Sequence, residues 1–157
     1  MENRIDITKV KIGMFCYEDN TFSFEILADK RRKGIVELID DINIYIDLTA
    51  SEISDINEKK LDWKGIFSYT RGLIFIPRAE RIIWYGIDDL LKVYCHYEPV
   101  RKTFEMIGKP CRRDFNWTIT FISGNRGMGV NFDNGKIERD TISNPHYYRP
   151  VLRLRYR

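Results

Sequence analysis

The sequence predicts an α+β domain, with strands towards both ends of the chain and two short helices between them. Alternation of apolar and polar residues at period two, which is typical of half-buried strands, recurs in residues 9–48 and 116–156. Apolar spacing of the helical kind is confined to residues 88–108. Because the two patterns are segregated along the chain, they do not favour alternating βαβ units.

The first third of the chain predicts two β-hairpins. Residues 9–26 predict the first, with a polar turn at residues 18–20, and residues 35–48 predict the second, with Asp40 and Asp41 at its apex. Neighbouring aspartates can take part in acid–base chemistry, but between two strands they are more often turn formers. We interpret this acidic pair as a turn.

The region between these hairpins and the helices is less regular. Residues 49–72 predict a long loop or short helical turns, anchored by Trp63, Ile66, Phe67 and Tyr69. Residues 73–76 form an apolar run that Pro77 ends. Residues 82–85 are compatible with another short strand or with the lead-in to a helix, and the sequence leaves both open.

Two short helices are predicted mid-chain. Asp88 is a good N-cap for the first, which places Leu90, Leu91 and Tyr94 on one face. The second has Pro99 in its first turn and an apolar face made of Val100, Phe104 and Ile107. Gly108 follows in the C′ position and ends it.

The C-terminal forty residues predict consecutive short strands joined by polar turns, at residues 116–121, 128–137 and 147–152. Asn134-Gly135 is the dipeptide that best tolerates positive φ at both central positions of a type I′ turn, so it predicts a hairpin there. Short strands of this kind make a scaffold that displays its loops.

Size and composition favour one folded domain spanning residues 1–157. The chain has 43% hydrophobic and 13% aromatic residues, which is outside the composition of disordered chains. It has no run of about 18 apolar residues, so we expect no insertion into a membrane. The first residues lack an apolar core behind a basic start, so they do not predict a secretory signal.

No residue pattern predicts an enzyme, a metal site or a cofactor. Cys16, Cys95 and Cys111 are odd in number and widely spaced, and we interpret them as buried free thiols. On a helix Cys95 and His96 would project about 100° apart, so one should be buried and one exposed, and they do not make a nucleophile–base pair. Asn131 and Asp133 could offer two oxygens to a hard cation, but two ligands are not a site, and a solvent-facing pair is the favoured interpretation.

Seven short segments follow one another in the order found in a known family. They are residues 12–23 (IGMFCYEDNTFS), 34–36 (GIV), 84–90 (WYGIDDL), 100–108 (VRKTFEMIG), 117–120 (WTIT), 130–135 (VNFDNG) and 148–151 (YRPV). In this order the chain resembles the C-type-lectin-like domains of bacterial surface proteins, including variable proteins diversified by retroelements, and the related sulfatase-modifying-factor fold. It departs from their pattern at Gly86, at Thr118 and Ile119, and at Met128. The paired C-terminal cysteines of the sulfatase-modifying relatives are missing here, so their oxygen chemistry is not expected.

The resemblance implies a C-type-lectin-like fold with paired N- and C-terminal strands, and with function on the loops between the last strands. Those loops are residues 122–127 and 136–147, whose donors, acceptors and aromatic ring suit adaptable recognition of a protein or a glycan. The candidate ligand-binding residues are Asn125, Arg126, Lys136, Glu138, Arg139, Asn144, His146 and Tyr147. The alternative is that these loops are merely solvated turns.

The last residues alternate arginine with apolar side chains. A strand would bury Leu152, Leu154 and Tyr156 and expose Arg153, Arg155 and Arg157. The arginines of this segment, which include Arg149, could form a stripe that binds phosphate groups. Alternatively, they could prevent an edge strand from pairing with another chain, or could pair with acidic residues elsewhere. The net charge of +3 is too balanced to predict a nucleic-acid partner by itself.

We therefore predict a non-enzymatic recognition or assembly module that binds a protein or glycan through its C-terminal loops, comparable to an adhesin, a receptor-binding domain or a virion component. The family resemblance suggests a cell surface or a virion, and the chain could form a homo-oligomer or belong to a larger assembly. One alternative is a nucleic-acid-binding protein that uses the C-terminal arginine strand. Another is an enzyme whose cysteines or histidines converge only in the fold.

Overall fold

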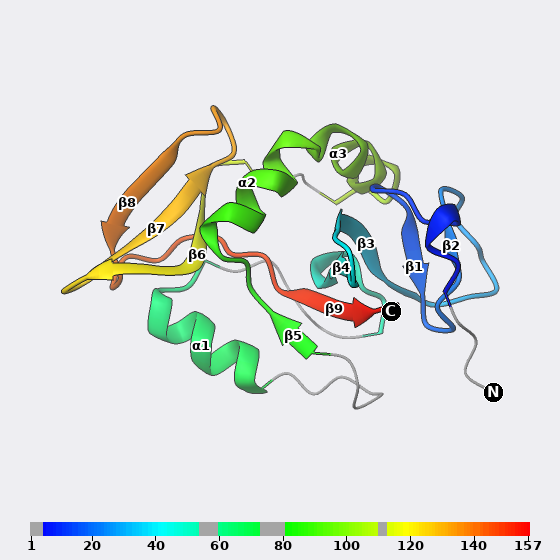
Figure 1. The fold of residues 1–157 in the computed structure, drawn as a ribbon, viewed down its shortest axis with the longest axis horizontal. Helices are drawn as coiled ribbons and strands as arrows, with labels where there is room; N and C mark the ends of the chain where they lie inside the picture. Colours follow the sequence, from blue (N-terminus) through cyan, green and yellow to red (C-terminus); the bar gives the residue numbers. More distant parts are fainter. Residues whose placement is uncertain (1–4, 54–59, 73–80, 110–112) are drawn as a thin grey trace.

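A six-stranded antiparallel sheet is the larger part of the computed structural model, which describes residues 5–53, 60–72, 81–109 and 113–157 (Figure 1). The described residues also form a three-stranded antiparallel sheet and three α-helices, which confirms the predicted α+β class. The larger sheet has the order β2 (Phe22–Ser23), β1 (Phe15–Tyr17), β3 (Arg32–Ile39), β4 (Asn43–Asp47), β9 (Val151–Arg155), β5 (Arg81–Ile83). The smaller sheet is β6 (Phe115–Ser123), β7 (Arg126–Asn131), β8 (Ile137–Thr141), and the helices are α1 (Trp63–Gly72), α2 (Ile87–Cys95) and α3 (Tyr97–Met106).

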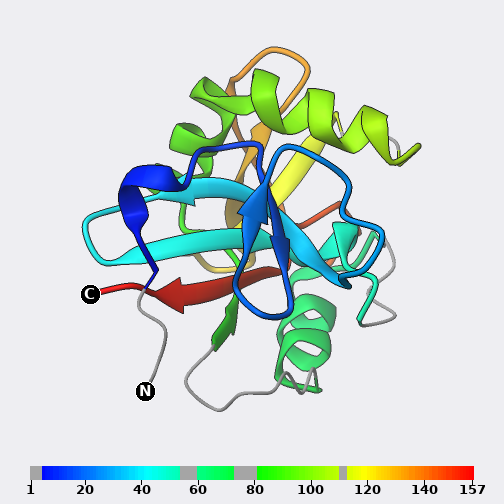
Figure 2. The ribbon, with the colours of Figure 1, turned by 90° about the vertical axis from the view of Figure 1, so that its right-hand side faces the viewer.

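The two ends of the chain meet in the larger sheet, as the sequence predicted. Every residue of β9 pairs with β4, from Val151 opposite Asp47 to Arg155 opposite Asn43. Figure 2 shows β9 lying alongside β4. The direct neighbour of β9 thus belongs to the second hairpin, while the first hairpin lies at the far edge, beyond β3.

Both N-terminal hairpins are present, and side chains of their turns stabilise them. The Asp40 carboxylate accepts hydrogen bonds from the backbone N–H groups of Ile42 at 2.9 Å and Asn43 at 2.6 Å. The interpretation of the acidic pair as a turn is therefore confirmed. In the first hairpin Asp19 accepts from the N–H of Thr21 at 3.1 Å, and Asn20 has a φ of 61°.

Both predicted mid-chain helices are present, but the N-cap of α2 differs from the prediction. The cap position is Gly86, and Asp88 lies inside the first turn, where its charge complements the helix dipole. A distant side chain replaces the missing cap, because Thr120 Oγ1 accepts from the N–H of Ile87 at 2.9 Å. At the end of α3 the N–H groups of Gly108 and Lys109 bond back to the last turn, which confirms the predicted C′ glycine. No helix in the described ranges is long and apolar enough to cross a membrane.

The larger sheet has apolar residues on both faces, and different elements cover them. α2 and α3 lie over one face, where Val93 packs with Leu38 and Val151, and Phe104 packs with Ile35. The opposite face holds a core of buried side chains that includes Cys16, Ile46, Leu152 and Leu154. N-terminal residues and Tyr69 of α1 pack against that second core. The predicted burial is confirmed for Leu152 and Leu154, whereas Tyr156 lies beyond the end of β9 and is half-buried.

A ten-residue helix, α1, occupies the end of residues 49–72, for which the sequence left a long loop or short helical turns open. Asp62 precedes it and accepts from the N–H of Gly65 at 2.7 Å, as an N-cap aspartate does. Two glycines and five aromatic or β-branched residues weaken the intrinsic helix propensity of the segment, which is why the sequence pattern is poor. The buried Ile66 confirms one of the predicted anchors. The apolar run at residues 73–76 lies outside the described residues, and the segment after it forms β5.

The smaller sheet confirms the hairpin around Asn134-Gly135 but corrects its turn and the predicted loops. Residues 137–141, predicted as part of the loop 136–147, form β8, and the predicted loop 122–127 is shortened because β6 runs to Ser123 and β7 begins at Arg126. β7 and β8 pair as predicted around Asn134-Gly135. The connection is longer than a two-residue type I′ turn, because Gly135 donates to the carbonyl of Asn131 at 2.7 Å and Asn131 donates to that of Lys136 at 2.9 Å. Of the two turn residues only Gly135 has positive φ, at 74°. A Cβ there would lie 2.3 Å from the ring of Tyr94, so the position requires glycine.

A buried arginine connects the larger sheet to α3. Arg149 is 1% exposed, and its Nη1 donates to Oε2 of Glu37 at 2.8 Å and to Oδ2 of Asp47 at 3.1 Å. Its Nη2 donates to the hydroxyl of Tyr97 at 2.9 Å. The ring centroid of Phe132 lies 4.5 Å from its Cζ. We call these five residues the Arg149 cluster.

A β-bulge brings Glu37 into the Arg149 cluster. The register between β3 and β4 shifts between Val36 and Leu38, so Glu37 is an extra residue with no opposite number on β4. Bulges of this kind redirect a side chain. The hydroxyl of Tyr85 donates to Oε1 of Glu37 at 3.4 Å, and burial followed by the charges of Glu37 and Asp47 raises the pKa of Tyr85 well above its usual value.

The Arg149 cluster keeps its charges although it is buried. Burial alone would lower the pKa of Arg149, but Tyr97, Glu37 and Asp47 raise it well above its usual value. The interpretation that an arginine of this segment pairs with acidic residues elsewhere is thus confirmed for Arg149. The predicted start of the last strand, at residue 147, is wrong: β9 begins at Val151, and Arg149 lies in the segment before it.

We expect Arg149→Ala to lower the free energy of unfolding by about 3–5 kcal/mol, because it would leave two buried carboxylates without their cation. Urea unfolding followed by far-ultraviolet circular dichroism measures this change. The matched control, Arg155→Ala, removes an exposed arginine of the same segment and should stay within about 0.5 kcal/mol of the wild type. A loss below about 1 kcal/mol for Arg149→Ala would contradict the proposed role.

Candidate functional site

The smaller sheet lies at the end of the molecule opposite β1 and β2 (Figure 1). Two glycines of β7 allow two rings of β6 to lie flat across it. A Cβ on Gly129 would meet the Phe115 ring at 2.3 Å, and one on Gly127 would meet the Trp117 ring at 3.1 Å. We call this side of the sheet the aromatic face.

A segment just before β9 covers the aromatic face. The ring of His146 lies 4.3 Å from that of Phe115 and 5.2 Å from that of Trp117, centroid to centroid. Its Nε2 lies 2.6 Å from Oδ2 of Asp140 on β8. The Trp117 indole donates to the carbonyl of Asn144 at 3.1 Å, and the side chain of Asn144 donates to Asp140 at 2.9 Å. These contacts fasten the segment to the sheet.

Asp140 is the electrostatic centre of this arrangement. Burial would raise the pKa of its carboxyl, but hydrogen bonds from His146, the N–H of Thr141 and Asn144 outweigh burial and lower the pKa. The ionised form is therefore favoured, and each of its oxygens accepts a bond. Asp140, His146 and Asn144 hold the segment before β9 on the sheet, and we call these three residues the Asp140 clasp. Among the described residues no serine, threonine or cysteine side chain bonds to the His146 ring.

The opposite side of the smaller sheet, which we call the basic face, is only partly covered. On β7 and β8 it consists of Arg126 opposite Thr141, Met128 opposite Arg139, and Val130 opposite Ile137. Helix α2 covers its Val130 end, where Val130 packs with Leu90 and Val93. Away from that helix the face opens, and Arg126 and Arg139 are exposed.

The β7–β8 hairpin carries three exposed cations, and two of them, Arg126 and Arg139, share the basic face. Lys136 is exposed at the start of β8, and Arg126 and Arg139 lie on the basic face. The acidic side chains of β8 are bonded elsewhere, Glu138 to Asn131 at 3.1 Å and Asp140 to its clasp. Within the part of the chain that the structure describes, none of the three cations forms an ion pair.

The predicted ligand-binding residues fall into separate groups. Asn125, Arg126, Lys136 and Arg139 are exposed on the β7–β8 hairpin and its turns, although Arg126 and Lys136 stand at opposite ends of it. Asn144, His146 and the half-buried Glu138 make internal hydrogen bonds.

Tyr147 joins neither the exposed group nor the clasp. Its carbonyl accepts from the N–H of Trp117 at 2.8 Å, and its ring lies under the ammonium group of Lys60 at 4.8 Å. The structure thus brings part of the predicted set together as a surface, and uses the rest to support that surface.

Asn131 and Asp133 are not arranged around a common point. Oδ1 of Asn131 accepts from the N–H of Asp133 at 2.9 Å, and its amide donates to Glu138. Across the described residues no group of three or more histidine, cysteine, aspartate or glutamate side chains could hold a metal ion.

The C-terminal arginines have different surroundings. Arg153 is half-buried and pairs in register with Tyr45, whose hydroxyl donates to Asp40 at 2.7 Å. Arg155 and Arg157 are exposed, and Arg155 donates to the carbonyl of Arg157 at 2.7 Å. The exposed cations available for a phosphate stripe are fewer than the sequence pattern indicated, and such a stripe stays a prediction.

The interpretation of the cysteines was correct for Cys16 and wrong for Cys95. Cys16 is a buried thiol that donates to the carbonyl of Tyr17 at 3.7 Å, whereas both Cys95 and His96 are exposed. The helix ends at Cys95, and His96 lies at the junction with α3 with a φ of −118° and a ψ of 27°, so the helical spacing that would bury one of them is interrupted there. Cys111 lies outside the described residues.

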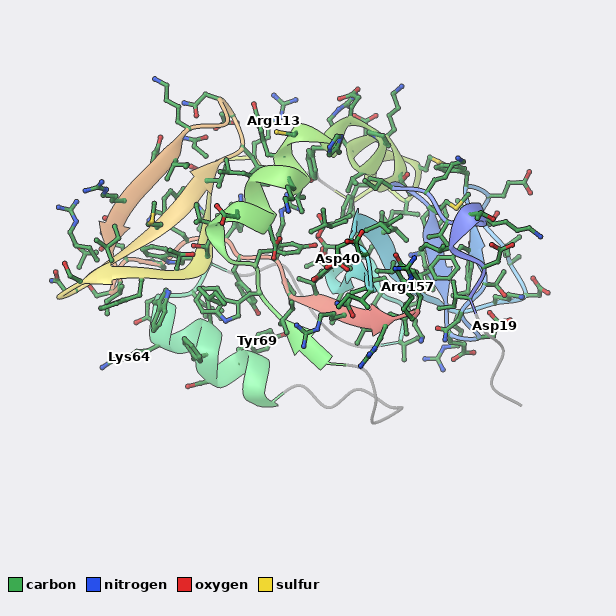
Figure 3. The ribbon with its side chains drawn as sticks, in the orientation of Figure 1. Asp19, Asp40, Lys64, Tyr69, Arg113 and Arg157 are labelled. Carbon is green, nitrogen blue, oxygen red and sulfur yellow. The ribbon has the colours of Figure 1, made fainter. Side chains whose placement is uncertain are left out.

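An exposed aromatic cluster escaped the sequence interpretation. The ring of Trp63 lies 4.7 Å from that of Phe67, 5.6 Å from that of Trp84 and 5.8 Å from that of Phe121. Phe67 and Phe121 remain 41% and 47% exposed, and Ile119 of the same strand is 45% exposed. In Figure 3 Lys64 projects from α1 into the surroundings, while Tyr69 of the same helix points towards the body of the molecule. The sequence signal that could have indicated this cluster was the pair of apolar residues Ile119 and Phe121 in one predicted strand.

Comparisons with protein-family models, with curated proteins and with solved structures found no match to this chain. The resemblance to C-type-lectin-like domains therefore stays a prediction.

We expect Gly129→Ala to destabilise the protein more than Gly127→Ala. A Cβ at position 129 would lie 2.5 Å from the backbone oxygen of Asn116 as well as against a ring, whereas at position 127 a ring edge at 3.1 Å is the nearest atom. Overpacking costs typically about 1–3 kcal/mol, so we expect about 3 kcal/mol for the first and about 1 kcal/mol for the second. Urea unfolding of both variants measures the order, and equal costs would contradict the described packing.

The Asp140 clasp should contribute to stability only where the carboxylate is ionised. Its pKa is lowered by folding, so the contribution is fully present above the unfolded value near 3.8 and is lost as the pH falls through the folded value. The wild type should exceed Asp140→Asn in unfolding free energy by a constant margin between about pH 5 and pH 6 and by a shrinking one below about pH 4. Urea unfolding at several pH values measures the margin. A margin that does not depend on pH would contradict the charge-based account.

Proposed function

We propose that the protein is a non-enzymatic recognition or assembly module that binds a protein partner through the basic face of its smaller sheet. The observation that carries the proposal is the pair of exposed arginines on this face, Arg126 and Arg139, neither of which has an ion-pair partner among the described residues. Ile137 is 47% exposed beside them, and Met128 is half-buried on the same face. A partner with acidic and apolar side chains would match this surface.

The chemistry of the face favours a protein over a glycan. Arginine and methionine are enriched at protein interfaces, and arginine is frequent among the residues whose truncation weakens binding most. The exposed Phe121 of β6 does not belong to this surface, because it pairs with Gly127 of the aromatic face. Sugars are recognised chiefly through many directed hydrogen bonds, and the side chains of Asn131, Asn144 and His146 are occupied by internal bonds.

Rigid support makes the face suitable for recognition. The Gly127 and Gly129 contacts, the Asp140 clasp and the packing of Val130 under α2 hold the three strands in place. A surface that is ordered before binding loses less conformational entropy on binding.

The C-type-lectin-like fold is part of this proposal. Its support is the position of β9 next to β4, the two helices between the β-rich segments, and a separate small C-terminal sheet. In the resemblance described above, function lies on the loops between the last strands, which here form the ends of the smaller sheet.

We expect the double variant Arg126→Ala/Arg139→Ala to capture at least tenfold less of its partners from native lysate or cell-surface extract, because losing about 1.4 kcal/mol of binding free energy is already tenfold. Quantitative mass spectrometry of the captured proteins measures the loss. The melting temperature should stay within about 2 °C, because both side chains are exposed.

Arg155→Ala/Arg157→Ala is the matched control, since it removes the same charge from exposed positions on the larger sheet. It should capture as much as the wild type. Protease treatment of the extract should remove the partner, whereas enzymatic removal of glycans should not. Equal capture by the two double variants would rule out the basic face as the binding surface.

A further inference from the structure

The outer edge of β8 is open. β8 pairs with β7 on one side only, and it is the last strand of its sheet. Figure 1 shows it at the margin of the molecule, with no other drawn element beyond it. An edge strand presents N–H and C=O groups that can pair with another chain.

The register shows which backbone groups face outward. The N–H of Asn131 donates to the carbonyl of Lys136 at 2.9 Å, and the N–H of Ile142 donates to the carbonyl of Asn125 at 2.7 Å. The β8-side members of these two bonds are Lys136 and Ile142, so even-numbered residues of this segment direct their backbone groups towards β7. Since the backbone groups of an antiparallel strand alternate in direction, those of Ile137 and Arg139 point away from β7.

The open edge is short, because the end near Thr141 is closed. The N–H of Thr141 donates to Oδ1 of Asp140 at 2.7 Å, and its carbonyl accepts from the N–H of Asn144 at 3.0 Å. The available edge therefore comprises the N–H and C=O groups of Ile137 and Arg139. This is enough for a segment of about three residues to add as a strand.

Charge opposes a second copy of this chain in the two symmetric registers centred on Glu138 and Arg139. Symmetric antiparallel pairing about Arg139 would set that residue against its own copy and Glu138 against Asp140. Pairing about Glu138 would set two glutamates opposite each other. Like charges directly opposite on neighbouring strands destabilise the pair.

The side chains beside the edge define the complementary segment. A residue opposite Arg139 would share its face with the cations Arg126 and Arg139, which favours an acidic side chain there. A residue opposite Ile137 would meet an apolar side chain that is 47% exposed. In an antiparallel orientation, the one used throughout this sheet, the complementary pattern is acidic, any residue, apolar.

We infer that the open edge of β8 accepts an extended acidic segment of a partner protein as a fourth antiparallel strand, an inference that rests on the function proposed above. Backbone hydrogen bonds to Ile137 and Arg139 would provide the register. The acidic side chain opposite Arg139 and the apolar one opposite Ile137 would provide the selectivity.

Three capped peptides test this directly on the full chain. The probe is acetyl-Ser-Thr-Glu-Thr-Val-Thr-amide. One control replaces its glutamate by lysine, and the other keeps the side chains but carries N-methyl groups on the glutamate and the valine, which removes the two donors that face β8. Amide chemical shifts of the isotope-labelled protein measure binding, and hydrogen exchange measures protection of Ile137 and Arg139.

The acidic peptide should give saturable shifts centred on β8 and slow the exchange of both amides at least tenfold, and both controls should bind at least tenfold more weakly. Equal binding of the N-methylated peptide, shifts centred on Phe121 instead of β8, or no binding at millimolar concentration would overturn the inference.

Ile137→Pro separates this inference from the proposed function. It removes an outward N–H at the first position of an edge strand, where proline is tolerated, and Ile137→Val is its matched control because it keeps that N–H. If Ile137→Pro loses peptide binding and partner capture while Ile137→Val keeps both, the strand-addition mode is supported. If Arg126→Ala/Arg139→Ala lowers partner capture and Ile137→Pro does not, the basic face binds the partner but the strand-addition mode is wrong. If neither lowers capture, the proposed function itself fails.

Discussion

One buried cation holds the parts of this fold in a single arrangement. Arg149 contacts a bulged residue of β3, the last residue of β4, the first residue of α3 and a ring from the turn between β7 and β8. Without Arg149, the buried carboxylates of Glu37 and Asp47 would lower the stability of the fold. Few other arrangements of the chain could satisfy all of these bonds at once. The cluster therefore couples the larger sheet, which contains both ends of the chain, to the smaller sheet that displays the candidate site. The position of the candidate site at one end of the molecule depends in this way on a charge balance at its centre.

Much of the fold follows from local sequence, because local signals and tertiary contacts agree there. The turns at Asp40 and Gly108 and the apolar sides of β4 and β9 were predictable from side-chain chemistry and period. The helix α1 was not, since its glycines and aromatic residues are poor helix formers and its stability comes from the rings it packs against. Likewise no pattern marks Glu37 as a bulge residue, because a bulge is defined by the strand opposite it.

The candidate site was predicted as a region more accurately than as a set of residues. Polar residues in the last loops looked alike in the sequence, but the structure divides them according to their neighbours. Arg126 and Arg139 are exposed, whereas His146 lies against two aromatic rings and an aspartate that are distant in the sequence. Such a division depends on long-range contacts. The exposed rings of Phe67 and Phe121 were missed for the same reason, since they come together only when α1 packs beside β6.

The three tryptophans of the chain all belong to one aromatic neighbourhood, which joins α1, the residue after β5 and β6. Tryptophan fluorescence will therefore report on this half of the molecule and will not detect changes in the β1–β2 hairpin at the other end. A fluorescence transition that coincides with the loss of backbone ellipticity would mean that the two sheets melt as one cooperative unit. A fluorescence change that precedes the loss of ellipticity would mean that the smaller sheet can open while the rest stays folded.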